Sequence, residues 1–183
     1  FRLRTKDGNW RWVLSRGKVM LRDPQGNPLR MTGTHIDITL RKQSEAALRT
    51  SEEKFYKAFQ ISPDAISITR RADTVYLDAN NVFVALSGCA REEIIGKTVD
   101  ELGLWAYPEQ RVEMIRLLQQ NGEVLGMEAT FRGKEGQSVV GLVAARSIEI
   151  DGVPCILTII RDITDRKQAA DLLRDAHVRL KWA

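Results

Sequence analysis

Few residues in this 183-residue chain have side chains suited to chemistry, and none of them stands in a catalytic or metal-binding pattern. The two cysteines, Cys89 and Cys155, and the two histidines, His35 and His177, lie in unrelated contexts. Nucleophile elbows, metal-ligand pairs, Walker loops and dinucleotide fingerprints are absent from the sequence. Residues 133–136, Gly-Lys-Glu-Gly, are typical of a hairpin turn rather than a phosphate-binding loop. The sequence therefore predicts no catalysis by this chain.

One segment with a carboxylate and a hydroxyl occurs twice. Residues 36–48 and 161–173 share an Asp, an Ile-Thr pair, an Arg-Lys-Gln run and a Leu at the same spacing, so that Asp37 aligns with Asp162. Self-similarity of this kind indicates repeated structural units. Each copy lies where a β-rich stretch gives way to a helix. The repeat therefore predicts a connector between modules, in which the carboxylate accepts backbone N–H groups or pairs with Arg166 or Lys167 nearby.

The elements that hold these residues follow from the hydrophobic pattern. Residues 1–38 predict three antiparallel strands, since Trp10, Trp12 and Leu14 alternate with other residues at the period of a half-buried strand. Residues 40–60 predict a helix, in which a possible capping box beginning at Thr50 predicts a pause. The rest of the chain predicts two strands, at residues 65–69 and 75–77, followed by helices at residues 80–86, 91–95 and 109–120. Three further strands are predicted at residues 124–132, 138–150 and 153–163, and a final helix runs from there to the end.

In the helix predicted at 109–120, the residues expected on the inner side are Val112, Ile115 and Leu118. A strand pair and a later strand meander with helices between them indicate an α+β fold, one antiparallel sheet covered on one face.

Composition narrows the function classes. The chain is 43% apolar and 28% charged, which is ordinary for a globular protein. Its net charge is only +4, and its basic residues alternate with acidic ones, so we expect no nucleic-acid partner. No apolar run approaches the roughly 18 residues of a membrane helix, so we expect no membrane contact. The two unrelated cysteines favour a cytoplasmic location. The chain begins at Phe1 in mid-pattern, and we expect it to be a piece of a longer protein.

The order of several motifs resembles one family. Asn80-Asn81-Val82-Phe83, Leu86-Ser87-Gly88, the run from Arg91 to Lys97 and Asp162-Ile163-Thr164 follow one another as they do in a PAS domain, so residues 55–165 resemble that family. Residues 1–39 resemble the C-terminal half of a preceding PAS domain. The resemblance implies a five-stranded antiparallel sheet with helices on one face, enclosing a small pocket. It divides the chain into a partial PAS domain (1–39), a helical linker (40–60), a complete PAS domain (61–164) and a signalling helix (165–183).

The resemblance also implies a function: a sensor, signal-relay and dimerisation module of a bacterial signalling protein, with a covalently linked histidine kinase or diguanylate cyclase outside this chain. It suggests that Asp37, Thr39, Asp162, Thr164 and Arg166 transmit sheet movement to the helices, beside the structural role of a helix cap. The alternative is a ligand-independent scaffold for protein assembly, with its pocket filled by its own side chains.

The pocket predicted from the resemblance is apolar and of unknown content. Its expected lining residues are Phe83, Leu86, Trp105, Met127, Phe131, Leu142 and Leu157, although core packing alone accounts for most of them. Haem is not expected, because residues 107–121 lack the histidine that haem-binding relatives supply. A flavin adduct is not expected either, because Cys89 precedes the helix that the reactive cysteine of light-sensing relatives follows. Cys155 is expected to be a small buried hydrophobe.

Two further expectations concern surfaces. Two helical stripes have a 4-3-4-3 spacing that favours a parallel homodimer, with Leu48, Phe55, Leu173 and Leu180 as their large apolar members. The stripes are Ser44, Leu48, Ser51, Phe55 and Ala58 at the first repeat, and Ala169, Leu173, Ala176, Leu180 and Ala183 at the second. The alternative is an ordinary helix packed on its own sheet. Trp10 and Trp12 would each cost roughly 1.5–3 kcal/mol if left exposed, so another chain or the second domain is expected to cover them.

Overall fold

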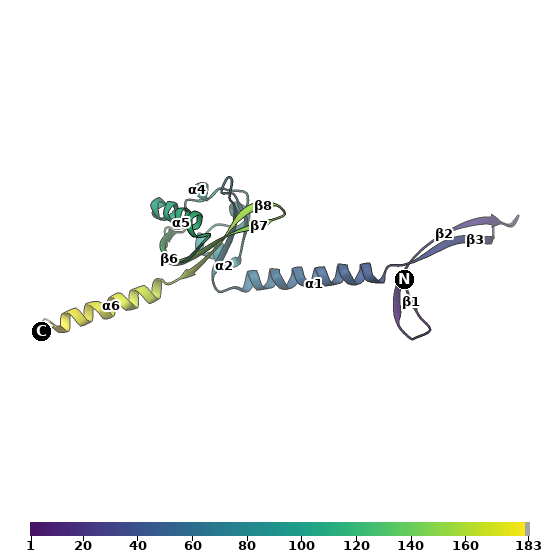
Figure 1. Ribbon diagram of the computed structural model, residues 1–183, viewed down its shortest axis with the longest axis horizontal. Helices are drawn as coiled ribbons and strands as arrows, with labels where there is room; N and C mark the ends of the chain where they lie inside the picture. The colour runs from purple at the N-terminus through teal and green to yellow at the C-terminus, as the bar shows by residue number, and fades with distance from the viewer. Residues whose placement is uncertain (182–183) are drawn as a thin grey trace. The chain divides into compact units, whose positions relative to one another are not determined.

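The computed structural model describes the backbone of residues 1–181 and the side chains of residues 1–174. It consists of two units, Phe1–Tyr56 and Lys57–Ala183 (Figure 1). Helix α1 (Thr39–Ile61) carries the chain from the first unit into the second. The α+β class predicted from the sequence is confirmed, with one sheet in each unit.

The first unit is a three-stranded antiparallel meander. Its strands β1 (Arg2–Arg4), β2 (Trp10–Arg22) and β3 (Pro28–Asp37) pair in chain order. The turn between β2 and β3 is fixed by Asp23, whose carboxylate accepts the backbone N–H groups of Gln25 and Asn27 at 3.0 and 2.7 Å. An aspartate is suited to this position because its short side chain can imitate a backbone turn.

One face of this meander carries exposed aromatic rings. Trp10 is 60% exposed and Trp12 is 39% exposed. The guanidinium of Arg2 lies 5.8 and 5.5 Å from the centres of their rings, within cation–π range. Leu14 and Ile36, which pair across β2 and β3, are also exposed. The expectation that another surface covers Trp10 and Trp12 stays a prediction.

Helix α1 runs without interruption through Thr50, so the predicted pause there is wrong. The Thr50 hydroxyl donates to the Ala46 carbonyl at 2.9 Å instead of capping a new helix. A threonine inside a helix can make this bond to the preceding turn, which removes its capping role. Ion pairs one turn apart, Arg41 with Glu45 and Arg49 with Glu53, add to the continuity of the helix.

The second unit is built on a five-stranded antiparallel sheet. Its strands are β4 (Ala65–Arg70), β5 (Tyr76–Ala79), β6 (Glu123–Arg132), β7 (Ser138–Ile150) and β8 (Val153–Asp162), in the spatial order β5-β4-β8-β7-β6. The last strand in the sequence is thus the central strand of the sheet. This places the start of the following helix next to two other strands.

Helices cover the core side of this sheet. They are α2 (Asn81–Ser87), α3 (Arg91–Ile94), α4 (Val99–Leu102) and α5 (Pro108–Asn121), and α6 (Thr164–Lys181) follows β8. Helix α5 packs on β6 and β7, and α2 packs on β4. Helix α4 was not predicted from the sequence, although its capping box is present: the Thr98 hydroxyl accepts the Glu101 N–H at 3.2 Å.

The inner side of α5 differs in part from the prediction. Met114 and Leu118 are buried and Ile115 is partly buried, but Val112 is 68% exposed. Met114 and Leu118 lie one turn apart and therefore share the face that meets the sheet. The placement of Val112 on the inner side is therefore wrong.

Two glycines shape the sheet beside the core. Gly126 has a φ of 77° at the bulge between Leu125 and Met127, a conformation that glycine adopts without steric cost. A Cβ on Gly141 would lie 2.5 Å from the Ile160 side chain and 2.7 Å from the Phe131 ring. Gly141 therefore leaves the space that the Phe131 ring fills.

Candidate functional site

The joint between β8 and α6 is held by side-chain hydrogen bonds to the backbone. The Asp162 carboxylate accepts the N–H of Thr164 at 2.8 Å. The Thr164 hydroxyl accepts the N–H of Val140, on the neighbouring strand β7, at 3.0 Å. The Ile163 N–H donates to the Val140 carbonyl at 2.9 Å. The first residue of the helix is therefore attached to β7 as well as to its own strand.

The joint between β3 and α1 repeats this arrangement bond for bond. The Asp37 carboxylate accepts the Thr39 N–H at 2.9 Å, and the Thr39 hydroxyl accepts the N–H of Trp12 at 2.9 Å. The Ile38 N–H donates to the Trp12 carbonyl at 2.9 Å. The sequence repeat is therefore also a structural repeat, in which Trp12 corresponds to Val140. The aspartate organises the turn, and the threonine connects the helix to the adjacent strand.

The first joint has an additional ion pair. The Arg11 guanidinium lies 2.6 Å from the Asp37 carboxylate. Hydrogen bonds from Thr39, and next from Arg11, lower the pKa of Asp37 to about 2. Asp37 therefore stays ionised, and able to accept the Thr39 N–H, down to strongly acidic pH. At the second joint the residue that corresponds to Arg11 is Val139.

The second joint has a cation on its helix instead. Lys167, on the first turn of α6, lies 2.5 Å from the Glu128 carboxylate on β6. The sequence suggested that Arg166 or Lys167 pairs with Asp162, but Lys167 pairs with Glu128, and Arg166 forms no ion pair with the residues that the structure describes. Because both partners are about half exposed, this pair contributes little stability and serves mainly to orient the helix.

Where the chain enters the second unit, a fully buried amide ties α1 to the core. The Asn80 side chain donates to the Phe59 and Asp64 carbonyls at 3.1 and 2.9 Å. Its oxygen accepts the N–H groups of Ile66 and Phe83, both at 2.9 Å. One residue thereby fixes the end of α1, the start of β4 and the start of α2. This role of Asn80 was not predicted from the sequence, although an asparagine directly before a helix is typical of an N-cap.

An ion pair connects the entry of the second unit to its exit. The Arg161 guanidinium binds the Asp64 carboxylate through two hydrogen bonds, of 2.9 and 2.8 Å. Asp64 precedes β4, and Arg161 is the neighbour of Asp162. These two hydrogen bonds lower the pKa of Asp64. The pair joins residues 97 positions apart, so only the pairing of β4 with β8 could have predicted it.

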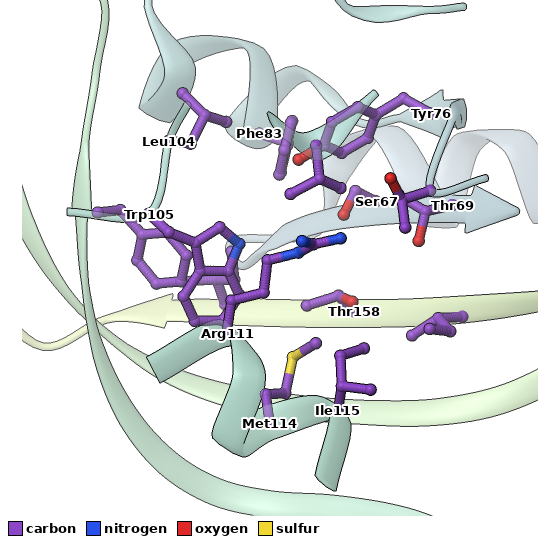
Figure 2. Close-up of a pocket in the computed structure, with 15 residues that line it drawn as sticks. Ser67, Thr69, Tyr76, Phe83, Leu104, Trp105, Arg111, Met114, Ile115 and Thr158 are labelled. Carbon is purple, nitrogen blue, oxygen red and sulfur yellow. The ribbon is translucent and has the colours of Figure 1, made fainter. Parts of the chain in front are cut away.

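A small cavity of about 40 Å³ lies between the sheet and α5 (Figure 2). Phe83, Trp105 and Phe131, three of the seven residues expected at a pocket, line it. The ring centres of Trp105 and Phe131 are 4.9 Å apart, which forms one wall. The other lining residues are Ser67, Thr69, Thr74, Tyr76, Val99, Leu104, Arg111, Met114, Ile115, Ile156, Thr158 and Ile160.

The other four expected lining residues lie elsewhere. On β8, Ile156, Thr158 and Ile160 line the cavity. Since alternate residues of a strand face opposite sides of the sheet, Leu157 lies on the other face, and so does Leu142 on β7. Leu86 and Met127 pack on the edge of the core without reaching the cavity. The polar lining residues were not predicted, because the sequence pattern indicates only which apolar residues face the core.

The remaining candidates lie away from this cavity. Cys89 and Cys155 are buried free thiols, whose sulfurs lie near the carbonyls of Ser87 and Val153. His35 is on β3, where its ring meets the edge of Phe1. The His177 side chain is outside the described residues. Among the described residues, no group of three or more His, Cys, Asp or Glu side chains is placed to hold a metal ion.

The residues expected at a dimer interface lie on exposed helix surfaces. On α1, Leu48 is 62% exposed and Phe55 is 70% exposed, and on α6 Leu173 is 73% exposed. The side chain of Leu180 falls outside the described residues. No helix of the described part of the chain has the length and apolar character needed to cross a membrane.

The second unit therefore belongs to a recognisable class, namely an α+β module with a small internal cavity, whose central strand ends in an exit helix. Models of known protein families match segments of both units. The PAS domain model matches residues 63–165, more than half of the chain, and the PAS fold model matches residues 1–35. The chain belongs to the PAS domain family.

Individual relatives agree with this assignment. The chain is 28% identical over 145 residues to the sensor histidine kinase TmoS of Ectopseudomonas mendocina, covering 76% of this chain and 14% of the relative. It is 31% identical over 101 residues to the two-component sensor PprA of Pseudomonas aeruginosa, covering 55% and 11%. It thus spans less than a quarter of the length of these relatives. The PAS domain of a Colwellia psychrerythraea protein has a TM-score of 0.53 and 26% identity, covering 62% of this chain and 97% of that one.

Proposed function

We propose that this chain is a sensor and signal-relay module of a signal-transduction protein, with a linked histidine kinase as its output. Relatives named as sensor kinases and two-component sensors support this role. We place the partial PAS domain at residues 1–39, the linker at 40–60, the complete PAS domain at 61–164 and the signalling helix at 165–183. We also propose a cytoplasmic location, with which two free thiols agree.

The observation that carries this proposal is the repeated strand-to-helix joint. In both copies a threonine hydroxyl accepts an N–H from the neighbouring strand, so the helix root is attached to two strands at once. A change in the relative position of β7 and β8 would therefore move the first turn of α6. Asp162 and Thr164 would transmit this movement to α6, and Asp37 and Thr39 would do the same for α1, while Arg166 is proposed as a contact of the outgoing helix.

The route across the second unit is short. Helix α1 ends at the Asn80 amide, and the segment after α1 is joined through Asp64 to Arg161. Arg161 directly precedes Asp162, the first residue of the exit joint. A displacement of α1 can thus reach α6 through one ion pair and one turn. Only a differential interaction of about 1–3 kcal/mol between two states is needed for such coupling.

The test replaces Thr164 with valine in the parent protein and measures the stimulus-dependent change in kinase autophosphorylation. Thr164→Val keeps the side-chain shape but removes the acceptor for the Val140 N–H, so the response should fall severalfold. Thr164→Ser keeps the hydroxyl and is the matched control, which should respond as the wild type does. Asp162→Ala should also uncouple the response while the fold stays intact.

Hydrogen exchange separates a lost relay from a lost fold. In Thr164→Val, the amides of the first turn of α6 should exchange faster, while those of β4 and β8 keep their protection. A normal kinase response together with this local loosening would contradict the relay proposal.

We also propose that the chain forms a parallel homodimer through Leu48, Phe55, Leu173 and Leu180. The high exposure of the first three supports this, since apolar side chains in a helical stripe are typical of a helix–helix contact. In sedimentation equilibrium, Leu173→Glu should shift the chain toward monomer, whereas Arg174→Glu, on the neighbouring position of α6, should not. An unchanged monomeric wild type at high concentration would rule the dimer out.

The second candidate function is a ligand-independent assembly scaffold. The small volume of the cavity, about 40 Å³, favours it, since such a pocket is largely filled by its own side chains. A scaffold of this kind would dimerise without changing its melting temperature on addition of any metabolite.

A further inference from the structure

The cavity of the second unit contains buried hydroxyls that lack partners. Ser67 and Thr158 pair across β4 and β8, and their side chains face this cavity together with the Tyr76 phenol (Figure 2). All three residues are more than nine-tenths buried. None of the hydrogen bonds in the described part of the chain involves their hydroxyls. Because an unpartnered buried polar group is destabilising, their presence together indicates a bound polar species.

A cation faces the same hydroxyls. Arg111, on α5, lines the cavity, and its side chain extends toward Ser67 and Thr158 (Figure 2). One of its nitrogens pairs with Asp100 on α4 at 3.0 Å, but Asp100 is 78% exposed and the Arg111 side chain only 21%. A guanidinium has five N–H donors, so Arg111 keeps donors for a second acceptor inside the cavity. The polar end of the cavity therefore favours an anion.

A surface hollow beside the cavity is lined by two arginines. This hollow, of about 340 Å³, shares Thr74, Arg111, Ile115 and Ile156 with the cavity, and Arg71 also lines it. Arg71 forms no ion pair with the described residues. The two arginines would attract a small anion from solution to this side of the cavity.

Size and polarity define the ligand further. Since one water needs about 10–15 Å³ of such space, a cavity of about 40 Å³ holds roughly three to four non-hydrogen atoms. The walls beyond the hydroxyls are apolar, with Phe83, Leu104 and Met114 among them. A planar carboxylate with a very short alkyl tail matches both ends of this space.

We infer that the cavity binds a short-chain monocarboxylate of the size of formate or acetate, with its carboxylate on Arg111 and on the hydroxyls of Ser67, Thr158 and Tyr76. This inference rests on the proposed sensor function, to which it supplies the class of stimulus. Arginine suits the role, because its guanidinium can offer two parallel hydrogen bonds to one carboxylate. The bound anion would also compete with Asp100 for Arg111, which connects occupancy of the cavity to the contact between α4 and α5.

Isothermal titration calorimetry of the 183-residue chain with sodium acetate tests the inference, with sodium chloride at equal ionic strength as the reference. We expect one site per chain and a dissociation constant on the order of 10⁻⁵ to 10⁻³ M, which is the range open to so small a ligand. Formate and acetate should bind, and hexanoate should not. Tighter binding with each added methylene would overturn the inference, because it would indicate an apolar surface site.

Variants on one helix give the matched comparison. Arg111→Gln should weaken acetate binding roughly tenfold to a hundredfold. Arg116→Gln, also on α5 but paired with Glu113 on the surface, should leave it unchanged. Thr158→Val should raise the melting temperature of the free protein and weaken acetate severalfold, which keeps the test valid if Arg111→Gln folds poorly. Equal acetate affinity in Arg111→Gln and wild type, or no heat from acetate at all, would overturn the inference.

The binding test is independent of the relay proposal. Thr164 does not line the cavity, so Thr164→Val should bind acetate with wild-type affinity even if it no longer signals. Failure to bind acetate would leave the relay intact with a different stimulus. A normal response in Thr164→Val would remove the relay and leave acetate binding in place.

Discussion

At the scale of single residues, Asn80 joins three elements of the second unit. Its four hydrogen bonds satisfy two carbonyls and two N–H groups from three elements, and it is fully buried. No hydrophobic side chain of similar size could provide these bonds. Asn80, the first residue of the motif at residues 80–83 that predicted the fold, thus holds several elements together.

We predict that Asn80→Ala lowers the free energy of unfolding of the second unit by about 2–4 kcal/mol, because it leaves several buried backbone groups unpaired. Urea unfolding followed by circular dichroism measures this change. Asn81→Ala, at the exposed neighbouring position, is the control and should change the free energy by less than about 0.5 kcal/mol. Similar stability of the two variants would show that Asn80 is not essential to the core.

The hydroxyls of the cavity predict the opposite effect on stability. Ser67→Ala removes a buried hydroxyl without a protein partner, so we expect the ligand-free protein to gain about 1 kcal/mol. Ser147→Ala, on the exposed part of β7, should have no effect. Differential scanning calorimetry of both variants checks the prediction, and a destabilised Ser67→Ala would mean that the hydroxyl is satisfied, for example by water.

At the scale of elements, the Asp64–Arg161 pair joins the segment after α1 to the central strand β8. Two hydrogen bonds join the guanidinium to the carboxylate, and the Asp64 side chain is only 16% exposed. We predict that Asp64→Asn lowers the free energy of unfolding by about 1 kcal/mol at pH 7, a value between those of exposed and buried pairs.

This effect should depend on pH in a definite direction. The pKa of Asp64 is lower in the folded protein than in the unfolded chain, where it is about 3.9. The ionised Asp64 carboxylate therefore stabilises the fold at pH values above about 3.9, and this stabilisation is lost as the pH falls through the lower, folded-state pKa. Urea titrations at pH 7, 5 and 3 should show the difference between wild type and Asp64→Asn constant between pH 7 and 5 and smaller at pH 3. A difference that grows toward acid pH would contradict the assignment.

Periodicity predicted the strands and most helices of both units, because a strand with one apolar face alternates with a period of two residues. In β2 the apolar face that carries Trp10 and Trp12 is exposed in the structure, so the pattern located the strand without reporting a buried face. The face of α5 was shifted because Val112 and Met114 are equally apolar, and only the packed sheet decides between them. Leu142 and Leu157 were assigned to the cavity by residue type. Their strands turn them to the other face, which depends on a register that the sequence does not define.

The joints were predicted more fully than the cavity. Each joint is local, because Asp, Thr and helix start follow one another within three residues, and the repeat made it visible. The cavity brings together Ser67, Arg111 and Thr158 from three elements that are far apart in sequence. Such a site depends on tertiary packing, and each of its polar residues looks like a surface residue when the sequence is read alone.

At the scale of the whole chain, the described contacts show that the last turn of α1 is part of the second unit. Phe59 is buried and provides a carbonyl to Asn80, and Gln60 accepts the N–H of Asn81 at 3.0 Å. A shortened chain of residues 62–183 loses these partners, whereas a chain of residues 39–183 keeps them.

We therefore predict that residues 62–183 unfold with a free energy about 2–4 kcal/mol lower than residues 39–183, because the Asn80 amide and the buried Phe59 ring both lose their contacts. Thermal unfolding and urea unfolding of the two shortened chains measure this difference. Equal stabilities would show that the second unit does not include the end of the linker.

The doubled joint has a consequence for how such proteins lengthen. Helix α1 begins at one Asp-Ile-Thr turn and ends at the Asn80 amide. The same helix therefore follows the last strand of one unit and leads into the first strand of the next. Duplication of the gene segment that encodes one module and its linker helix therefore yields a longer array. The new junction between modules uses the same strand-to-helix joint and the same helix end, so no new interface has to evolve. Further PAS modules can then be added in series, each joined to the next by a helix of this kind.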